Sequence, residues 1–367
     1  MTVSSDLATD NRVHKSCMLL CQLNFEVILI GRLKSNSPAM PIRNYRTKRL
    51  KLIFEKGALF YTFLNIRLFF LLLFKRLDYI FANDLDTLLA VYAVSKIKRK
   101  PILYDSHELF TEVPELIDRP RIRQIWLKIE RTILPRLKEI ITVNDSIAKE
   151  FEARYKIAAS VVRNVPQRLE KIEGYTKEEL QLSRSQKMLI IQGSGLNIHR
   201  GIEEAVMAME HIENAVLFLV GDGDVIPKAK EIVDNLKLNS KVRFVGRMPY
   251  TELMRYTASA DLGLALDKPT SLNYKLALPN KVFDYIQASV PIVSGPLIEI
   301  ERIIEKYECG IVIEKIEIEL LAKQLKTLLL DGRRLGQLKN NCQKAAQIEN
   351  WDEEQKILAA AIRRVFI

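Results

Sequence analysis

Short apolar runs alternate with longer amphipathic segments along most of the chain. In the first half the runs at 25–30, 79–82, 101–104 and 140–143 are typical of buried strands. Between and around them, helical periodicity is found at 59–74, 86–97, 122–133 and 145–155, and a further helix contains Leu19, Leu20 and Leu23. Residues 34–56 are basic and interrupted by prolines, which predicts a loop. Alternating strands and helices indicate an open, parallel α/β sheet.

The alternation stops at residues 169–185 and then starts again. These residues are charged and contain no strand signal, so we predict a linker there, after a first domain at 1–168. Strands are expected at 188–192, 216–220, 242–245, 262–266, 290–293 and 310–313, with helices at 201–209, 227–236, 250–258 and 297–306. We therefore expect a second doubly wound domain at 186–350, facing the first across a cleft, with ligands bound beyond the carboxyl ends of the strands.

The two ends of the chain give separate expectations. Residues 351–367 form an amphipathic pattern and predict a final helix. The first residues contain few apolar positions for a complete first strand, which indicates that part of that strand is missing from the start of the sequence.

Composition limits the class of protein. The chain has 367 residues, of which 48% are hydrophobic and 28% charged, as in globular proteins with enough length for two cores. The four cysteines (Cys17, Cys21, Cys309 and Cys342) form no CxxC motif, which favours a reducing, cytoplasmic setting without a structural zinc. We expect neither a signal peptide nor a membrane-spanning helix, because Asn65 and Arg67 interrupt the most apolar region.

Positive charge is concentrated at the start of the chain. Residues 1–100 contain 17 Lys and Arg against 7 Asp and Glu, which accounts for +10 of the total net charge of +11. Within 43–76 the basic residues alternate with aromatic ones, a composition that suits an anionic bilayer surface. A solvated face above a buried helix is the alternative. No nucleic-acid-binding motif is found, so no nucleic acid partner is expected.

The segment LPNKVFDYIQASVPIV, residues 278–293, combines a helix start with unusual chemistry. Asn280 is expected to cap the helix, and Lys281 follows in the first turn, where the helix dipole disfavours a cation. A bound anion would explain this lysine. One turn later, Asp284 is suited to accept hydrogen bonds from a vicinal diol such as a ribose. The spacing predicts a nucleotide site, and an ordinary amphipathic helix with a charged outer face is the alternative.

Several such segments in order resemble the GT-B glycosyltransferases, specifically the retaining group 1 (family 4) enzymes of the bacterial surface-polysaccharide type. The resemblance rests on LATDNRVHK, FANDLDTLL, ILYDSHELFTEVPEL, TVNDSIAKEF, HRGIE, FLVGDGD, VRFVGRMPYTEL and LPNKVFDYIQASVPIV, and it covers nearly the whole chain. It implies two Rossmann-like domains, with a UDP- or GDP-sugar donor on the second and a lipid-linked or polysaccharide acceptor on the first. It also implies metal-independent hexosyl transfer without a cofactor, and a final helix that returns to the first domain.

The resemblance assigns roles to the donor-side residues. Asp284 matches the second acidic residue of the family's paired-glutamate motif, which binds the ribose, whereas Leu276 occupies the first acidic position. Arg200 and Lys281 would share the charge of the diphosphate. The remaining donor-side candidates are Asn273, Tyr274 and Asn280 near the sugar, and Gly246, Arg247 and Met248 at the base.

The first domain supplies the remaining candidates. His107 matches a histidine often found at this strand end in the family, where it would contact the donor sugar or transfer the acceptor proton, and Glu108 and Asp105 compete for the second role. The acceptor-side residues are Asp10, Arg12, His14 and Asp84, for which structural roles are the alternative. A sugar-nucleotide 2-epimerase of the same fold and a non-catalytic nucleotide-sugar-binding subunit also fit this pattern.

Overall fold

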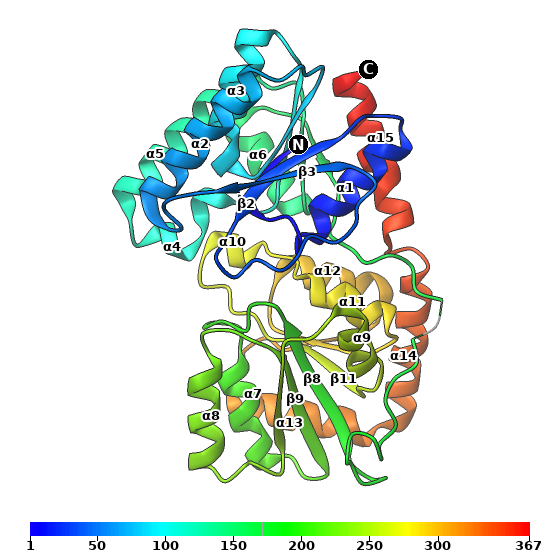
Figure 1. Ribbon diagram of the computed structural model, residues 1–367. Helices are drawn as coiled ribbons and strands as arrows, with labels where there is room; N and C mark the ends of the chain where they lie inside the picture. The colour runs from blue at the N-terminus through cyan, green and yellow to red at the C-terminus, as the bar shows by residue number, and fades with distance from the viewer. Residues whose placement is uncertain (171) are drawn as a thin grey trace. The chain divides into compact units, whose positions relative to one another are not determined.

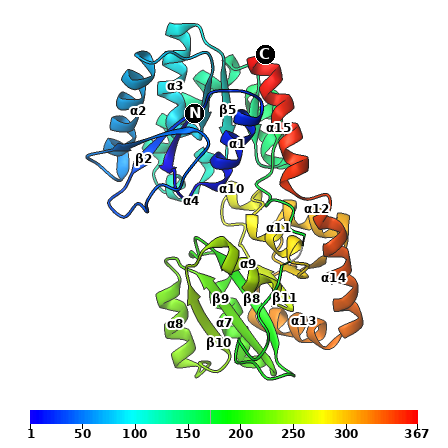
Figure 2. The same ribbon diagram turned by 45° about the vertical axis from the view of Figure 1, so that its right-hand side comes forward.

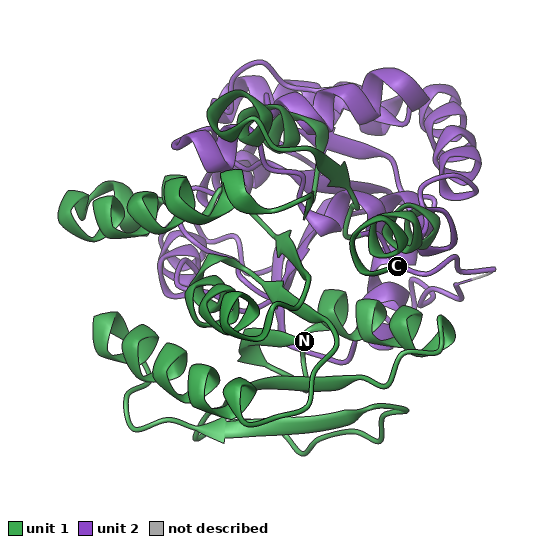
Figure 3. Ribbon diagram, turned by 90° about the horizontal axis from the view of Figure 1, so that it is seen from above, with its two compact units in different colours: residues 1–164, 354–367 green, residues 165–353 purple. Residues whose placement is uncertain are grey.

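The chain folds into two compact units. The computed structural model describes residues 1–170 and 172–367 (Figure 1). The first unit contains Met1–Asn164 and Glu354–Ile367, and the second contains Val165–Glu353 (Figure 3).

The first unit is built on a seven-stranded sheet. Its strands are β1 (Thr2–Asp6), β2 (Ile28–Leu33), β3 (Arg46–Lys51), β4 (Ile80–Asn83), β5 (Ile102–Ser106), β6 (Ile140–Thr142) and β7 (Ala159–Val161). Every pairing is parallel, and the order is β3-β2-β1-β4-β5-β6-β7. The strand order reverses between β1 and β4, which is the switch point where doubly wound sheets bind ligands.

Two strands of this sheet differ from our expectations. The polar segment TVSSD forms β1 between β2 and β4, although it contains few of the apolar residues that we expected of a first strand. The Asn83 amide donates to the carbonyl of Thr2 (2.9 Å), so a side chain supports the buried backbone there. The predicted loop at 34–56 contains β3, an edge strand of sequence RTKRLK. Its lysines and arginines protect this edge strand from pairing with other chains. They also interrupt the apolar alternation by which a strand is recognised in a sequence.

Helices cover both faces of the first sheet. They are α1 (Asn11–Gln22), α2 (Gly57–Leu73), α3 (Leu85–Lys98), α4 (Pro114–Ile117), α5 (Pro120–Ile133), α6 (Asp145–Tyr155) and α15 (Trp351–Phe366). Short 3₁₀ turns lie at Phe110–Glu112 and Leu134–Arg136. Helices α2, α3 and α5 pack on one another (Figure 1), and the turned view shows α2 and α3 side by side (Figure 2). The rings of Tyr61 on α2 and Trp126 on α5 meet edge to face, with 5.1 Å between their centroids.

The second unit repeats the architecture with six strands. These are β8 (Lys187–Gly193), β9 (Ala215–Gly221), β10 (Val242–Gly246), β11 (Leu262–Ala265), β12 (Ile292–Ser294) and β13 (Gly310–Val312), in the order β10-β9-β8-β11-β12-β13. All pairings are parallel, and the switch point lies between β8 and β11. The prediction of two Rossmann-like parallel-sheet domains is confirmed.

The helices of the second unit divide between the two faces of its sheet. They are α7 (Ile202–Ala208), α8 (Ile226–Asn235), α9 (Tyr250–Ala258), α10 (Leu272–Lys275), α11 (Asn280–Gln287), α12 (Ile298–Tyr307), α13 (Ile318–Leu330) and α14 (Gly332–Ala346), with a 3₁₀ turn at Met209–His211. Helices α7, α8 and α13 pack together on one side, and α11 packs against α9 and α14. Leu189, Leu217, Leu264 and Leu325 belong to the core between the sheet and the first group.

The described part of residues 169–185, where we predicted the linker, belongs to the second unit; Lys171 lies outside the described residues. Tyr175 donates its backbone N–H to the Ser259 hydroxyl (2.7 Å), and its hydroxyl bonds Glu252 on α9. Near the other end of the chain, α15 leads back to the first unit, where Arg364 forms two hydrogen bonds with Glu139 (2.8 and 2.6 Å). Within residues 1–170 and 172–367, no helix has the length and apolar character needed to cross a membrane.

Candidate functional site

In the second unit, polar side chains gather at the carboxyl ends of β8 and β11. Gln192 lies near the end of β8, Asp267 follows β11 by two residues, and Lys281 and Asp284 lie on α11. Because parallel strands end at the same edge of a sheet, residues that are 92 positions apart in sequence come into hydrogen-bonding contact there. This is the edge where a doubly wound sheet binds a ligand.

Asp267 joins the two cations that we assigned to the diphosphate. It forms ion pairs with Arg200 through Oδ1 and with Lys281 through Oδ2, at 3.2 Å in the second case. Burial alone would raise the pKa of Asp267, but the charges of Lys281 and Arg200 hold it below the usual range. The sequence correctly predicted that Arg200 and Lys281 lie together. It did not predict Asp267, whose negative charge reduces the net charge of the three residues to +1.

The first turn of α11 begins differently from our prediction. Pro279 is the N-cap, Asn280 is the first helical residue, and no side chain among the described residues caps the helix, so the expected Asn280 cap was wrong. Lys281 is only 9% exposed, and the first turn contains no acidic residue. The amino end of α11 and the Lys281 ammonium therefore place positive charge together beside Asp267.

Asp284 is held by donors from two other elements. The Tyr250 hydroxyl, at the start of α9, donates to Oδ1 (2.8 Å), and the Gln192 amide donates to Oδ2 (3.0 Å). The Thr257 hydroxyl bonds Gln192 Oε1 in turn. Sequence reasoning missed Tyr250 and Gln192, and their positions at a strand end and at a helix start were the only available signals.

The short helix α10 contains the residues expected near the donor sugar. Ser271 caps it, and the Tyr274 ring lies beneath the Arg200 guanidinium, 4.9 Å from the Arg200 Cζ to the ring centroid. Asn273 is buried, and so is Leu276, which occupies the first acidic position of the family motif. Tyr274 therefore contacts the cationic cluster, while Leu276 contributes an apolar side chain to the interior.

The loop expected at the base lies beside the two glycine-rich turns that follow β8 and β9. Arg247 donates to the carbonyl of Ser194 (3.2 Å) and lies 3.6 Å from the Asp222 carboxylate. Gly246 has φ +77°, a conformation that favours glycine, and Met248 is half-buried. A Cβ on Gly221 would lie 1.9 Å from the carbonyl oxygen of Gly193, so these turns approach closely only because they contain glycine.

The first unit contains a second polar cluster, centred on His107. The His107 Nδ1 lies 3.1 Å from Asp84 Oδ2, and Nε2 lies 3.4 Å from Asp105 Oδ2. The backbone N–H of His107 donates to Asp84 Oδ1 (3.0 Å). Burial alone would lower the pKa of His107, but the two carboxylates raise it well above the ordinary value. The two carboxylates therefore favour the imidazolium form of His107, in which both ring nitrogens donate and neither accepts a proton.

Arg12 holds the Asp105 side of this cluster. Its guanidinium binds Asp105 through two hydrogen bonds (3.0 and 2.6 Å) and donates a third to the carbonyl of Val162 (2.7 Å). Both side chains are buried, and Arg12 followed by His107 holds the pKa of Asp105 far below the usual range despite its burial. Arg12, which we listed on the acceptor side, thus lies with its guanidinium inside the unit and bound to protein groups.

Asp86 is a further carboxyl group of the same cluster. It lies in the first turn of α3 and is 5% exposed. Burial, followed by the negative charge of Asp84, raises the pKa of Asp86 to about 7. Asp84 itself has φ +59°, which is uncommon for a non-glycine residue and marks a constrained position next to His107.

The other candidates of the first unit have local structural contacts. Asp10 caps α1 by accepting from the backbone N–H of Val13 (3.0 Å), and His14 Nδ1 lies 2.8 Å from the Tyr45 hydroxyl. Burial and then the Arg43 charge lower the pKa of His14. The carbonyl of Glu108 accepts from the Ser106 hydroxyl (2.8 Å). Asp84 and Arg12 therefore belong to the His107 cluster, whereas Asp10 supports α1 and His14 contacts Tyr45.

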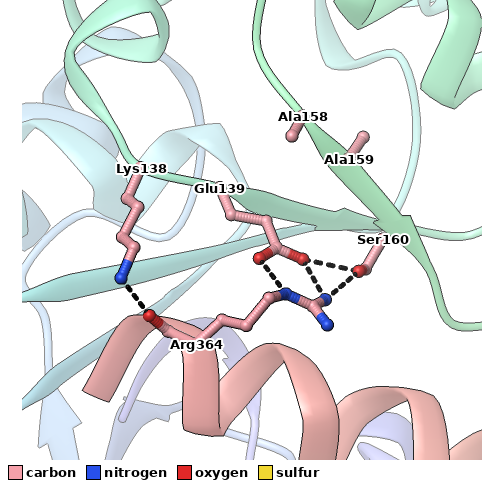
Figure 4. A pocket seen from close by; sticks show the side chains of 6 residues that line it. All are labelled: Lys138, Glu139, Ala158, Ala159, Ser160 and Arg364. Carbon is pink, nitrogen blue, oxygen red and sulfur yellow. Dashed lines mark hydrogen bonds and ion pairs between the residues drawn. The ribbon is translucent and has the colours of Figure 1, made fainter. Parts of the chain in front are cut away.

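A cavity of about 550 Å³ lies elsewhere, lined by Lys138, Glu139, Ala158, Ala159, Ser160 and Arg364 (Figure 4). These residues lie at the amino ends of β6 and β7 and on α15, so the cavity opens at the edge opposite to the one where doubly wound sheets bind ligands. The Arg364 side chain crosses it to reach Glu139 and Ser160 (Figure 4). We therefore assign this cavity to the packing of α15.

Comparison with known proteins gives two family matches that together cover most of the chain. Residues 176–348 match the family model "Glycosyl transferases group 1", and residues 11–167 match "Glycosyltransferase Family 4". A search of curated proteins found no match.

Solved structures share the fold at low sequence identity. Sucrose-phosphate synthase from Thermosynechococcus elongatus is 18% identical with a TM-score of 0.78, over 96% of this chain and 92% of that one. Anabaena Alr3699/HepE in complex with UDP is 14% identical with a TM-score of 0.75, over 99% of each chain. WaaG, a glycosyltransferase involved in lipopolysaccharide biosynthesis, is 16% identical with a TM-score of 0.68, over 99% and 98%. Two consecutive family matches and these structural neighbours identify the chain as a glycosyltransferase with the GT-B fold.

Proposed function

We propose that this chain is a retaining hexosyltransferase that moves a sugar from a UDP- or GDP-sugar to a lipid-linked or polysaccharide acceptor in cell-surface glycan synthesis. The observation that carries the proposal is the cluster of Arg200, Lys281 and Asp284 at the carboxyl edge of the second sheet. The two cations and the start of α11 suit a diphosphate, and Asp284 lies on the next turn of the helix, within the same unit, where a ribose would follow.

The donor would be bound without a metal or a cofactor. Two cations and a helix amino end are the groups that stabilise a departing diphosphate when no metal is used. UDP and UDP-glucose are bound by the structural neighbour Alr3699/HepE, which supports a uridine donor. For His107 we propose a contact with the donor sugar, because it directly follows β5 at the carboxyl edge of the first sheet, and Glu108 remains the candidate for the acceptor proton.

We also place the protein on the cytoplasmic face of the membrane, bound peripherally to an anionic surface. Helix α2 buries Phe60, Leu64, Leu68 and Leu72 and exposes apolar side chains on its other face. Phe70 is 53% exposed, and Phe74 just after the helix is 81% exposed. Basic residues lie close to these side chains in sequence, among them Arg67, Lys75 and Arg76, and the combination suits anionic lipid.

Calorimetric titration with UDP, GDP and their sugars, with and without a chelator, tests the donor assignment. Arg200→Ala and Lys281→Ala should abolish measurable nucleotide binding and sugar transfer, whereas Lys228→Ala, which removes an exposed lysine of α8, should leave both unchanged. Binding and transfer near wild type in both site variants would overturn the roles proposed for these residues.

Incubation with donor alone distinguishes the two alternative functions. An epimerase would change the sugar without an acceptor. A non-catalytic subunit would bind the nucleotide and show neither transfer nor donor hydrolysis.

A further inference from the structure

Three elements converge on the carboxylate of Asp284. Tyr250 at the start of α9 and Gln192 near the end of β8 each place a donor against a different oxygen of this side chain on α11. Asp284 is 9% exposed and Gln192 is 1% exposed, so the contacts lie at the border of the interior. Two donors on two oxygens fix both the rotation and the plane of the carboxylate.

The Gln192 side chain is itself oriented. Its Oε1 faces the Thr257 hydroxyl, which leaves its Nε2 to face Asp284. The reverse orientation of the amide would bring Oε1 against a carboxylate oxygen, where neither atom could donate. A buried chain of hydrogen bonds therefore runs from α9 through β8 to α11.

Tyr250 connects this chain with the loop expected at the base. It directly follows Gly246–Pro249, and its side chain remains 40% exposed while the hydroxyl is bound to Asp284. Burial of the hydroxyl, followed by the charge of Asp284, raises the pKa of Tyr250 well above its ordinary value. The hydroxyl therefore stays protonated and keeps donating throughout the physiological pH range.

We propose that Tyr250 and Gln192 are positioning residues that hold Asp284 against the 2′- and 3′-hydroxyls of the donor nucleotide, so that this site selects ribonucleotides over 2′-deoxyribonucleotides. The inference rests on the proposed nucleotide-sugar function. Aspartate reaches one methylene less far than the glutamate of the family motif, so its carboxylate must be held in one rotamer to meet a diol. A carboxylate can accept about four hydrogen bonds, so one carboxylate can serve protein donors and a diol together.

Selection follows from the cost of an unmet hydrogen bond. A ribose donates its 2′-hydroxyl to the fixed carboxylate, whereas a 2′-deoxyribose brings a methylene to the same position. Sites built to accept a hydroxyl discriminate strongly against the analogue that lacks it. If the carboxylate were free to rotate, it could turn to water and the discrimination would decrease.

The test is calorimetric titration of the full chain with UDP, 2′-deoxy-UDP, GDP and 2′-deoxy-GDP. For wild type we expect a preference of about tenfold or more for the ribonucleotide. Tyr250→Phe should weaken ribonucleotide binding and bring the preference below about threefold, with little change for the deoxynucleotide. Gln192→Met, which keeps the volume and removes the amide, provides a second variant with the same expectation.

Tyr175→Phe is the matched control. It also removes a tyrosine hydroxyl that bonds a carboxylate on α9, in this case Glu252. It should leave the ribose preference at its wild-type value. Circular dichroism and thermal melting of each variant separate loss of fold from loss of selectivity.

Each outcome either supports or overturns the inference that Tyr250 and Gln192 position Asp284. If wild type binds ribonucleotides and deoxynucleotides equally, or if both site variants retain the full preference, the inference is overturned and the proposed donor site stands. If wild type binds no nucleotide, both are overturned. Combining either variant with Asp284→Asn should add little further loss of preference, because all three changes remove the same interaction.

Discussion

Lys281 and Asp267 form an ion pair with 3.2 Å between Nζ and Oδ2, and the same carboxylate also binds Arg200. Asp267 is 1% exposed and lies between two cations of the candidate diphosphate site. It fixes their side chains before a ligand arrives, at the cost of one unit of the positive charge that would attract the ligand. The cluster thus combines a structural role with a binding role.

Asp267→Asn should lower stability and strengthen binding of pyrophosphate. Removing one partner of a buried ion pair leaves uncompensated charge, and we expect a loss of about 3 kcal/mol in the free energy of unfolding, measured with urea. The net charge of the cluster rises from +1 to +2, so the dissociation constant for pyrophosphate should fall. Glu231→Gln, at an exposed pair with Lys228, should change stability by no more than about 0.5 kcal/mol. Unchanged stability of Asp267→Asn would contradict the role of this ion pair.

Asp84→Asn should lower the pKa of His107. The variant removes one of the two charges that stabilise the imidazolium, while the asparagine tolerates the positive φ of this position. Nuclear magnetic resonance titration of labelled histidines measures the change directly. His14 is an internal control, and its titration should not move. An identical pKa of His107 in both proteins would show that Asp84 does not stabilise the charged form of His107.

The charge of His107 also affects stability in a defined direction. Its pKa is raised in the folded state, so its contribution is fully present below pH about 6.5 and is lost as the pH rises through the folded value. The Asp84→Asn variant should therefore show a smaller loss of stability above pH about 6.5 than wild type.

Asp86→Asn should remove part of the pH dependence of stability between pH about 4 and 7. The pKa of Asp86 is raised to about 7 in the folded state, so the unfolded chain loses this proton first and stability decreases as the pH rises through that window. Denaturant unfolding at several pH values should show a smaller slope for the variant and greater stability than wild type at pH 8. The pKa values of Asp105 and Asp267 are lowered, so these residues change the pH dependence of stability only below pH about 4, outside the window of Asp86.

Asp78→Asn is the control for this experiment, because Asp78 is an exposed carboxylate paired with Lys100. It should keep the wild-type slope. A slope that persists in Asp86→Asn would show that Asp86 ionises normally.

The Phe70→Ser and Phe74→Ser double variant should weaken binding to vesicles. Burial of two exposed phenylalanines in the interface contributes to adsorption, so we expect a loss of at least about tenfold in sedimentation with phosphatidylglycerol-containing vesicles at low salt. Leu330→Ser, which removes a side chain that is 85% exposed on the second unit, should bind as wild type does. Wild-type protein that stays in solution with these vesicles would overturn the membrane proposal.

The fold was predictable where the local pattern was strong. Buried parallel strands such as β9 (AVLFLVG) are nearly continuous apolar runs, and helices such as α5 show their apolar face at regular spacing, so both could be located from sequence. Strands β1 and β3 were missed for opposite reasons. The polar β1 is supported by a hydrogen bond from the Asn83 side chain, which is distant in sequence, and β3 lies at an edge where charge replaces apolar alternation.

The candidate site was predictable only within single segments. Lys281 and Asp284 lie one turn apart on one helix, so their joint role followed from spacing. Asp267, Tyr250 and Gln192 lie on other elements and carry no local signal, because a single aspartate after a strand or a tyrosine at a helix start is common.

The sequence by itself determined two parallel α/β units, the positive charge of the first hundred residues and the pairing of a cation with a carboxylate on α11, because these properties depend on neighbours along the chain. The tertiary structure alone decided what those side chains bind. It placed Asp267 between Arg200 and Lys281, and it enclosed His107 between Asp84 and Asp105. The physical reason is that parallel strands bring their carboxyl ends together whatever their separation in sequence, and charge interactions depend on distance in space.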